Sequence, residues 1–465
     1  MLGRSSSAPS HPVPGVWIAG AILVWTFAWE NARTVPGVAD ASLTSIIPLP
    51  TSFRLVEVAG VGLLFILGVG QAREWKDAQR TGLVLLFCLL LLSMTSTIVS
   101  VLSGLTSGAD ALQTVYSFTA PFLVVAIVGL RPAGQDDAER ILGIFVLFVG
   151  VSAAVAWWEM VHLNAFGDDV HGLMRDAHHF ASAAWIVVLW WVARLWKRVG
   201  KPFMNALGIL AFAPAALYAS NEKSNIAFLI VLGAAVAVAA WRRSWGYKVA
   251  ISGGTLLVAF LAQLLISGQL KLPQSFGHIQ IVLENLPSIG FFEGYRKVAD
   301  VTGEFPRIWA VGAGPASYGS FKAIDAVAIG GQVPPLAARY TAESYRLIFA
   351  ANGLLGSYLE QSTDLSAFFV EFGPIALLLF GGTLWWLVLR PARDASRESD
   401  AQPVQGAIAQ WVILSTCFFL VMSAFTAFYG WATLQGSVWP TMCVAGLLQA
   451  RTVREVSQTE VASDA

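Results

Sequence analysis

Long apolar blocks constrain this chain more than any other feature of its sequence. Between short charged stretches, the apolar residues run in blocks of roughly 16 to 26, the length at which a helix spans a bilayer. Of the 465 residues 56% are hydrophobic and only 12% charged, about half the charged fraction of an average soluble domain. Segments such as "AVAWWEMV" and "TLWWLVLR" place Trp near block ends, where amphipathic rings favour the headgroup level. The sequence therefore predicts an all-α, polytopic membrane protein.

Twelve membrane-spanning helices are predicted from the length and spacing of the blocks. The first has no small-residue cleavage site after it, so we expect an uncleaved span. The net charge of zero gives no reason to expect nucleic acid as a partner. The three cysteines lie inside apolar blocks, which favours core packing over a disulfide framework or a zinc site: Cys88, Cys417 and Cys443. The expected spans are 15–30, 55–71, 81–104, 114–130, 141–161, 178–196, 203–220, 225–241, 248–267, 365–390, 406–428 and 432–450.

Basic residues sort onto alternate connections between these spans. One set of five short connections and the tail holds seventeen Lys and Arg residues, whereas the short connections of the other set hold four: Arg33, Arg54, Arg175 and Lys223. Because basic loops stay on the cytoplasmic side of a membrane, we expect both termini in the cytoplasm. The predicted divisions are a cytoplasmic N-terminus at 1–14, spans 1 to 9 within 15–267, a periplasmic loop at 268–364, spans 10 to 12 within 365–450 and a cytoplasmic tail at 451–465.

The predicted periplasmic loop between spans 9 and 10 is about 97 residues long. Its segments "HIQIVLENLPSIGFFEGYRKVADV" and "AESYRLIFAANGLLGSYLEQ" have the apolar periodicity of amphipathic helices that lie along a membrane surface. Turns such as "GAGP" and "GGQVPP" separate them. A loop of this length with helices of its own is more often functional than a simple connector. The glycine turn does not predict dinucleotide binding, because no strand or βαβ unit surrounds it.

Basic residues on the predicted outer side run against the positive-inside rule, so they require a physical reason. The planar fork of donors on Arg suits it to a diphosphate. The alternative for each residue is a solvated charge or a local ion pair, such as Glu343 with Arg346. Arg307 is a further cation of the same loop. The candidate diphosphate-binding residues are Arg296, Arg175, Lys223, Arg339 and Arg346.

Two carboxylates and two histidines are candidate acids or bases. Asp364 opens the tenth predicted span, and Glu371 follows two turns later on the same face, roughly 10 Å along the axis. An acid at that depth usually faces a polar cavity; the alternative is a hydrogen bond or ion pair between helices. His178 and His179 lie at an outer span end beside Arg175, where either a base at neutral pH or interfacial packing fits.

These motifs, in this order, resemble the O-antigen ligase and polysaccharide polymerase superfamily of bacterial inner-membrane glycosyltransferases. The segment "YRKVADVTGEFPRIWAVGAGPASYGS" is similar to the family's Arg-bearing helix and Gly-x-Gly-Pro-Gly turn, with Ala313 and Ala316 at relaxed positions. "STDLSAFFVEFGPIALLLF" is similar to the family's polar motif followed by Glu-x-Gly-x-x-Gly, with Ala376 in the position of the last glycine. "RDAHHFASAAW" and "ASNEKSNIAF" resemble two upstream outer motifs. The resemblance covers about 174–389 and implies a GT-C-like fold.

The resemblance implies glycan transfer on the outer leaflet, from undecaprenyl diphosphate to a sugar hydroxyl on another lipid-linked unit. No metal or other cofactor is expected, because the diphosphate is already a good leaving group and the enzyme supplies cations and positioning. Asp364 is then the preferred base, with Glu371, His178 or His179 behind it. The residues that shape the loop would present backbone N–H groups to the donor or pin the Arg296 helix against the membrane: Gly312, Gly314 and Pro315.

One departure from the family bears on the choice of reaction. Its ligases carry a His-Asn pair entering the tenth span, where this chain has Thr363 and Asp364. The departure favours a polymerase of O-antigen or exopolysaccharide repeat units in the bacterial inner membrane, with a flippase and a chain-length regulator as partners. The alternatives are a ligase that moves finished glycan to lipid A core or protein, and a transporter or flippase of lipid-linked sugars. A transporter would be expected to carry mid-span charges and helices broken by Gly or Pro.

Overall fold

The computed structural model describes residues 13–31, 59–66, 77–134, 136–165, 169–174, 177–219, 222–241, 290–319, 333–340, 363–397, 402–425 and 437–450. The described residues form helices joined by turns, and no β-strand occurs among them. Within these ranges, six helices are long and apolar enough to cross a membrane: Gln79–Leu102, Gly108–Gly129, Asp137–His162, Ala177–Trp196, Asp364–Arg397 and Pro403–Ala424. Three shorter apolar helices accompany them, at Gly15–Phe27, Pro202–Tyr218 and Ser224–Val238.

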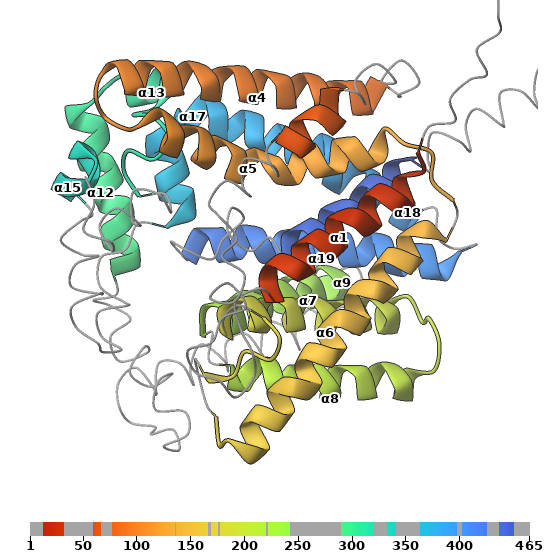
Figure 1. Ribbon diagram of the computed structural model, residues 1–465. Helices are drawn as coiled ribbons and strands as arrows, with labels where there is room; N and C mark the ends of the chain where they lie inside the picture. Colours follow the sequence, from red (N-terminus) through yellow and green to blue (C-terminus); the bar gives the residue numbers. More distant parts are fainter. Residues whose placement is uncertain are drawn as a thin grey trace, which may run out of the picture.

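The helices fall into a group before the predicted outer loop and a group within and after it (Figure 1). The first group is α1 (Gly15–Asn31), α4 (Asp77–Leu102), α5 (Gly108–Gly129), α6 (Asp137–His162), α7 (Ala177–Trp196), α8 (Pro202–Tyr218) and α9 (Glu222–Trp241). The second group is α12 (Gly290–Glu304), α13 (Ile308–Val311), α15 (Pro335–Tyr340), α17 (Asp364–Leu384), the π-helix η6 (Trp385–Leu389), α18 (Arg390–Arg397) and α19 (Pro403–Phe425). Residues 59–66 and 437–450 are also helical.

Helices lie at the positions of most of the predicted spans. α1, α4, α6 to α9 and α19 begin and end within a few residues of predicted spans, and residues 437–450 fall inside the last one. α5 begins at Gly108, before its predicted start at 114, and α17 begins next to its predicted start at 365. The prediction at 248–267 lies outside the described residues, so the count of twelve stays a prediction. The tenth span differs from its prediction, because helical structure continues through η6 into α18 as far as Arg397. Arg390 and Arg393 therefore lie on a helix and not in a loop.

Polar contacts tie helix termini together at one end of the bundle. The Gly15 N–H donates to the Pro132 carbonyl at 2.9 Å, and Lys197 Nζ donates to the Ser396 carbonyl at 2.8 Å. We call this the α18 end, and Figure 1 shows α12, α13 and α15 at the opposite end, the α12 end. The arrangement separates the basic connections from the described part of the predicted outer loop. The helix ends and connections at the α18 end hold Arg131, Arg140, Arg194, Arg198, Arg390 and Arg393.

Buried tryptophans join the helices of the interior. α19 packs on both α7 and α9, and α7 packs on α8. Trp411 of α19 is fully buried, and its indole N–H donates to the Ile186 carbonyl of α7 at 2.9 Å. Trp185 of α7 donates in the same way to Asn225 Oδ1 of α9 at 2.8 Å. Each indole thus fills apolar space and satisfies its polar atom, which fixes how these three helices align.

A second interior seam runs between α5 and α17. Phe118 meets Phe368 edge to face with ring centroids 5.0 Å apart, and Phe122 meets Phe380 at 5.1 Å. Phe368 also stacks on Phe372 at 4.7 Å within α17. Aromatic pairs of this geometry contribute about 0.5–1.5 kcal/mol each beyond the area they bury. The seam packs α17 against α5 on both sides of Gly373.

The outward face of α4 is apolar along most of its length. One side of α4 packs on α17, while Val84, Phe87, Leu91 and Ile98 on another side are each more than half exposed. Their spacing of three, four and seven residues places them on one helix face. A contiguous apolar face of this kind is what a lipid bilayer covers.

Candidate functional site

The glycine turn at residues 312–319 wraps around the side chain of Glu371. Glu371 lies in α17 and is completely buried. One carboxylate oxygen accepts the backbone N–H of Ala316 at 2.9 Å, and the other accepts those of Tyr318 at 2.9 Å and Gly319 at 3.0 Å. Three charge-assisted hydrogen bonds compensate much of the cost of burying a carboxylate.

The backbone of α17 reinforces this contact because the helix is broken at Gly373. Gly373 has a φ of 85° and a ψ of 168°, and Pro374 follows it. The carbonyls of Val370 and Glu371 then turn away from the helix and accept the N–H groups of Ala313 at 2.8 Å and Gly314 at 2.9 Å. Carbonyls exposed by a break inside a membrane need such partners, so the turn and the break form one unit.

Glycines make the close approach of turn and helix possible. Gly312 has a φ of 76°, and a Cβ there would overlap the Glu371 carbonyl. Gly314 has a φ of 114°, and a Cβ there would overlap the Ser100 side chain of α4. A Cβ at Gly373 would lie 2.7 Å from the Ile308 carbonyl. All three positions combine a positive φ with a neighbouring atom so close that it leaves no room for a side chain.

These contacts bind the turn to α17 through backbone and carboxylate together. The N–H groups of the turn that were expected to face a donor are bonded to α17 instead, and the second expectation, that the turn pins the Arg296 helix against the membrane, stays a prediction. Both oxygens of Glu371 accept backbone N–H groups, and its expected role as an acid or base stays a prediction. Pro315 stands between Gly314 and Ala316 and has no N–H to place.

Tyr318 shares the buried setting of Glu371. Burial, and after it the negative charge of Glu371, raises the pKa of the Tyr318 phenol well above its usual value. The phenol is therefore kept neutral beside the carboxylate.

Asp364 lies at the end of α17 that faces α12, and it is 5% exposed. Thr363 caps the helix: its hydroxyl accepts the Ser366 N–H at 3.1 Å, while the Ser366 hydroxyl accepts the Thr363 N–H at 2.8 Å. This reciprocal arrangement fixes the first turn. An ionised carboxylate in that turn is favoured by the helix dipole.

A tyrosine links this helix start to the helix that carries Arg296. The Thr363 hydroxyl donates to the Tyr295 hydroxyl at 3.2 Å, and that hydroxyl donates to the Ala424 carbonyl of α19 at 3.2 Å. Burial raises the pKa of Tyr295, against a smaller lowering effect of the bond from Thr363. Arg296, the next residue along α12, is exposed. The contact therefore joins the elements that carry Arg296 and Asp364.

Of the other predicted cations, Arg339 alone has its side chain among the described residues. Arg339 of α15 pairs with Glu304 of α12, with its two terminal nitrogens 2.7 Å and 2.9 Å from the two carboxylate oxygens. This pair is largely exposed and neutralises Arg339 locally. Arg175 and Arg346 lie outside the described residues. Lys223 lies in the first turn of α9, and its side chain is also outside the description.

The two candidate histidines open α7. His179 is 4% exposed, whereas His178 is half-buried. Both lie at the α12 end of their helix, the end of the bundle that also holds Asp364. Their candidacy as bases stays a prediction.

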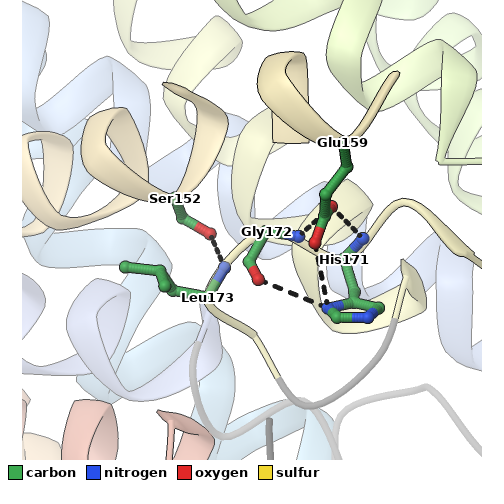
Figure 2. A network of polar contacts seen from close by, with 5 residues as sticks. All are labelled: Ser152, Glu159, His171, Gly172 and Leu173. Carbon is green, nitrogen blue, oxygen red and sulfur yellow. Dashed lines mark hydrogen bonds and ion pairs between the residues drawn. The ribbon is translucent and has the colours of Figure 1, made fainter. Parts of the chain in front are cut away.

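Glu159 repeats the arrangement of Glu371 in another helix (Figure 2). It lies in α6, is 2% exposed, and one of its oxygens accepts the backbone N–H groups of His171 at 3.1 Å and Gly172 at 2.9 Å. The other oxygen lies 3.6 Å from His171 Nδ1. Ser152, two turns earlier, accepts the Leu173 N–H at 2.9 Å. A second buried carboxylate therefore holds a second turn at the end of the bundle where α6 finishes and α7 begins.

Sequence reasoning missed Glu159, although a signal was present. It is an acid inside the apolar block "AVAWWEMV", and the cost of burying an acid there applies as much as it does to Glu371. Its partners are backbone N–H groups, which have no side-chain signature.

Comparison with known proteins adds no assignment to this geometry. No protein-family model matches the chain. No curated protein matches it either.

Proposed function

We propose that the chain is an inner-membrane glycosyltransferase that polymerises oligosaccharide repeat units carried on undecaprenyl diphosphate. The observation that carries the proposal is the joining of α12, the glycine turn and the start of α17 through Glu371 and Tyr295. These are the segments on which the sequence resemblance rests. Their union at the α12 end supports a site in which Arg296 and Asp364 act on one substrate.

In this reaction the acceptor hydroxyl oxygen attacks the anomeric carbon of the donor glycan. The bond from that carbon to the diphosphate oxygen breaks, and undecaprenyl diphosphate leaves with the electron pair. Asp364 takes the hydroxyl proton, and Arg296 offsets the charge on the leaving diphosphate. Glu371 positions the turn and touches neither substrate. A periplasmic site follows from the predicted orientation, in which the α18 end faces the cytoplasm.

The test is chain growth by purified protein supplied with lipid-linked repeat units. Wild-type protein is expected to lengthen the glycan, and Arg296→Ala to lower kcat by about a hundredfold or more, the effect of removing one charge-stabilising donor. Asp364→Asn is expected to cost a similar factor through loss of the base. Lys297→Ala, next to Arg296 on α12, is the matched control and keeps activity. Normal chain length with Arg296→Ala would contradict the proposal.

A cell-based measurement separates polymerase from ligase. In cells that carry Arg296→Ala, a polymerase leaves single lipid-linked units, whereas a ligase leaves finished polymer on undecaprenyl diphosphate. Extraction and sizing of the lipid-linked glycans distinguishes the two.

One observation favours a transporter as second candidate. The break at Gly373 lies nine residues from the start of α17, inside the helix predicted as the tenth span. Spans broken by Gly or Pro are typical of transporters. Here the carbonyls of Val370 and Glu371 accept the N–H groups of Ala313 and Gly314, which reduces their capacity to coordinate an ion. Movement of a labelled lipid-linked sugar across proteoliposomes without chain growth would favour this candidate.

A further inference from the structure

Arg307 is a half-buried cation between the end of α4 and the glycine turn. Its Nη1 donates to Ser103 Oγ at 3.3 Å, and its Nη2 donates to the Ala313 carbonyl at 3.4 Å. Its Nε is buried and has no hydrogen-bond acceptor within the described chain. Both partners are neutral and both bonds are long, so the guanidinium retains capacity to donate to an anion.

Among the described residues, Arg307 lacks the carboxylate partner that Arg339 has. Arg339 meets a carboxylate, Glu304, whereas none of the ion pairs found in the described chain includes Arg307. A partly buried cation without a counter-charge is costly. Arg at such a position is the residue best suited to bind a phosphate group through its planar fork.

The surroundings of Arg307 indicate where the anion comes from. Leu102, adjacent to Ser103, is 83% exposed, and Trp309, two residues after Arg307, is 58% exposed. Ile98 continues this exposed apolar surface one turn further along α4. An exposed Trp beside apolar side chains at a helix end is typical of the headgroup level of a membrane. An anion that reaches Arg307 along this surface belongs to a lipid.

We infer that Arg307 binds the phosphate group of a membrane lipid, with the lipid tail lying along Ile98, Leu102 and Trp309. The geometry around Arg307 supports the binding of a phosphate group. The identity of the lipid as undecaprenyl diphosphate rests on the proposed function. A phospholipid headgroup offers the same chemistry, and the experiment separates the two sources.

The test measures binding of defined lipids to the purified full-length chain in detergent by native mass spectrometry. The probes are undecaprenyl diphosphate, undecaprenol, which lacks the phosphates, and phosphatidylglycerol. Wild-type protein is expected to bind undecaprenyl diphosphate about tenfold or more tightly than undecaprenol, as a charge-assisted bond provides. Arg307→Gln removes most of that difference and leaves undecaprenol binding unchanged. Arg307→Lys falls between the two, since it keeps the charge and loses the fork.

Two further variants separate binding from a structural role of Arg307. Ser103→Ala removes one hydrogen-bond partner of Arg307 and keeps its charge, so lipid affinity is expected to remain. Arg140→Gln removes an exposed arginine at the α18 end, where it pairs with Asp137, and is the matched control for loss of one positive charge.

The outcomes decide both claims separately. Suppose that wild-type protein binds phosphatidylglycerol and undecaprenyl diphosphate equally well, and that Arg307→Gln binds both more weakly. The lipid-phosphate site is then upheld, but it no longer supports the proposed glycosyltransferase. Equal wild-type affinity for undecaprenol and undecaprenyl diphosphate overturns the inference without any variant. So does unchanged affinity in folded Arg307→Gln, or an equal loss in Ser103→Ala. Absence of chain growth alone would overturn only the proposed function.

Discussion

The backbone N–H of Ala316 donates to Glu371 Oε2 across 2.9 Å, from a left-handed conformation with a φ of 60°. The two residues are 55 positions apart in the chain, and their contact joins the glycine turn to the interior of α17. A non-glycine residue adopts a positive φ only where its surroundings compensate the strain. The carboxylate supplies that compensation here, so the turn and the buried charge depend on each other.

Replacing Glu371 by Gln is expected to lower the free energy of unfolding by about 3 kcal/mol. The amide keeps the shape of the side chain but offers one acceptor oxygen, and its NH2 group faces backbone donors. Unfolding in mixed micelles of maltoside and SDS, followed by Trp fluorescence, measures the change. Glu139→Gln, at an exposed position in the first turn of α6, is the control and should leave stability nearly unchanged. Equal stability of the two variants would contradict the assigned role.

Hydrogen exchange is expected to distinguish the two buried glutamates. Glu159→Gln should accelerate amide exchange at His171 and Gly172 and leave the turn at 316–319 protected, because each carboxylate accepts N–H groups from its own turn only. Glu371→Gln should do the reverse. Exchange measured by mass spectrometry on peptides that cover each turn tests the pair. Acceleration of both turns by either substitution would indicate global unfolding instead.

The effect of a substitution at Ala316 on stability is expected to depend on how well the new residue adopts a positive φ. Ala316→Gly removes strain of about 1–2 kcal/mol and loses about 0.4–1 kcal/mol through the greater freedom of the unfolded chain, so stability should stay equal or rise slightly. Ala316→Val should lower stability by more than 1 kcal/mol, because a β-branched residue fits this conformation poorly. The same unfolding measurement applies, and a Gly variant less stable than the Val variant would refute the explanation.

Three glycines are expected to tolerate no side chain. Gly312→Ala, Gly314→Ala and Gly373→Ala each add a Cβ that meets backbone or the base of a side chain at a position of positive φ. Each should reduce the yield of monodisperse protein in size-exclusion chromatography. Gly303→Ala and Gly381→Ala are matched controls in α12 and α17, since a Cβ at either position meets nothing within 4 Å. Both controls should gain rather than lose helix stability.

Alkaline pH is expected to destabilise the fold partly through Tyr318. Its pKa is raised in the folded protein from the ordinary value of 10.0, so its contribution to stability is complete below pH 10 and is lost as the pH rises towards the folded-state pKa. The unfolded chain gains by ionising this phenol while the folded chain does not. Tyr318→Phe should therefore lose less stability than wild type above pH 10. An identical alkaline unfolding midpoint for both proteins would show that Tyr318 does not contribute.

Local patterns were enough to predict most of the long apolar helices among the described residues. The length and spacing of apolar blocks predicted α4, α6 and α7 to within a few residues, because a bilayer-spanning helix needs that many apolar residues in sequence. The continuation of α17 into α18 was not predicted. Charged residues such as Arg390 and Arg393 indicated a loop, whereas they extend the helix, with Arg390 and Arg393 stacked over Trp386 and Trp385.

The partners of the candidate site residues could not be predicted from local patterns. The sequence indicated Glu371 and the glycine turn separately, but the hydrogen bonds that join them connect residues 52 to 55 positions apart, and backbone donors leave no trace in composition. The same holds for Arg339, whose partner Glu304 is 35 positions away. Arg296 and Asp364 were predicted as individual candidates, and the link through Tyr295 depends on a tyrosine that no motif singled out.

The break at Gly373 has a consequence for how the protein is made. As α17 enters the membrane, the carbonyls of Val370 and Glu371 need partners that lipid cannot supply. Those partners lie in residues 313 and 314, which the ribosome synthesises before α17. The turn is therefore already outside the ribosome when α17 emerges, so the N–H donors are present before the carbonyls that they bind. A circular permutant that placed residues 312–319 after α17 would have to insert that helix while the carbonyls of Val370 and Glu371 still lacked these N–H donors.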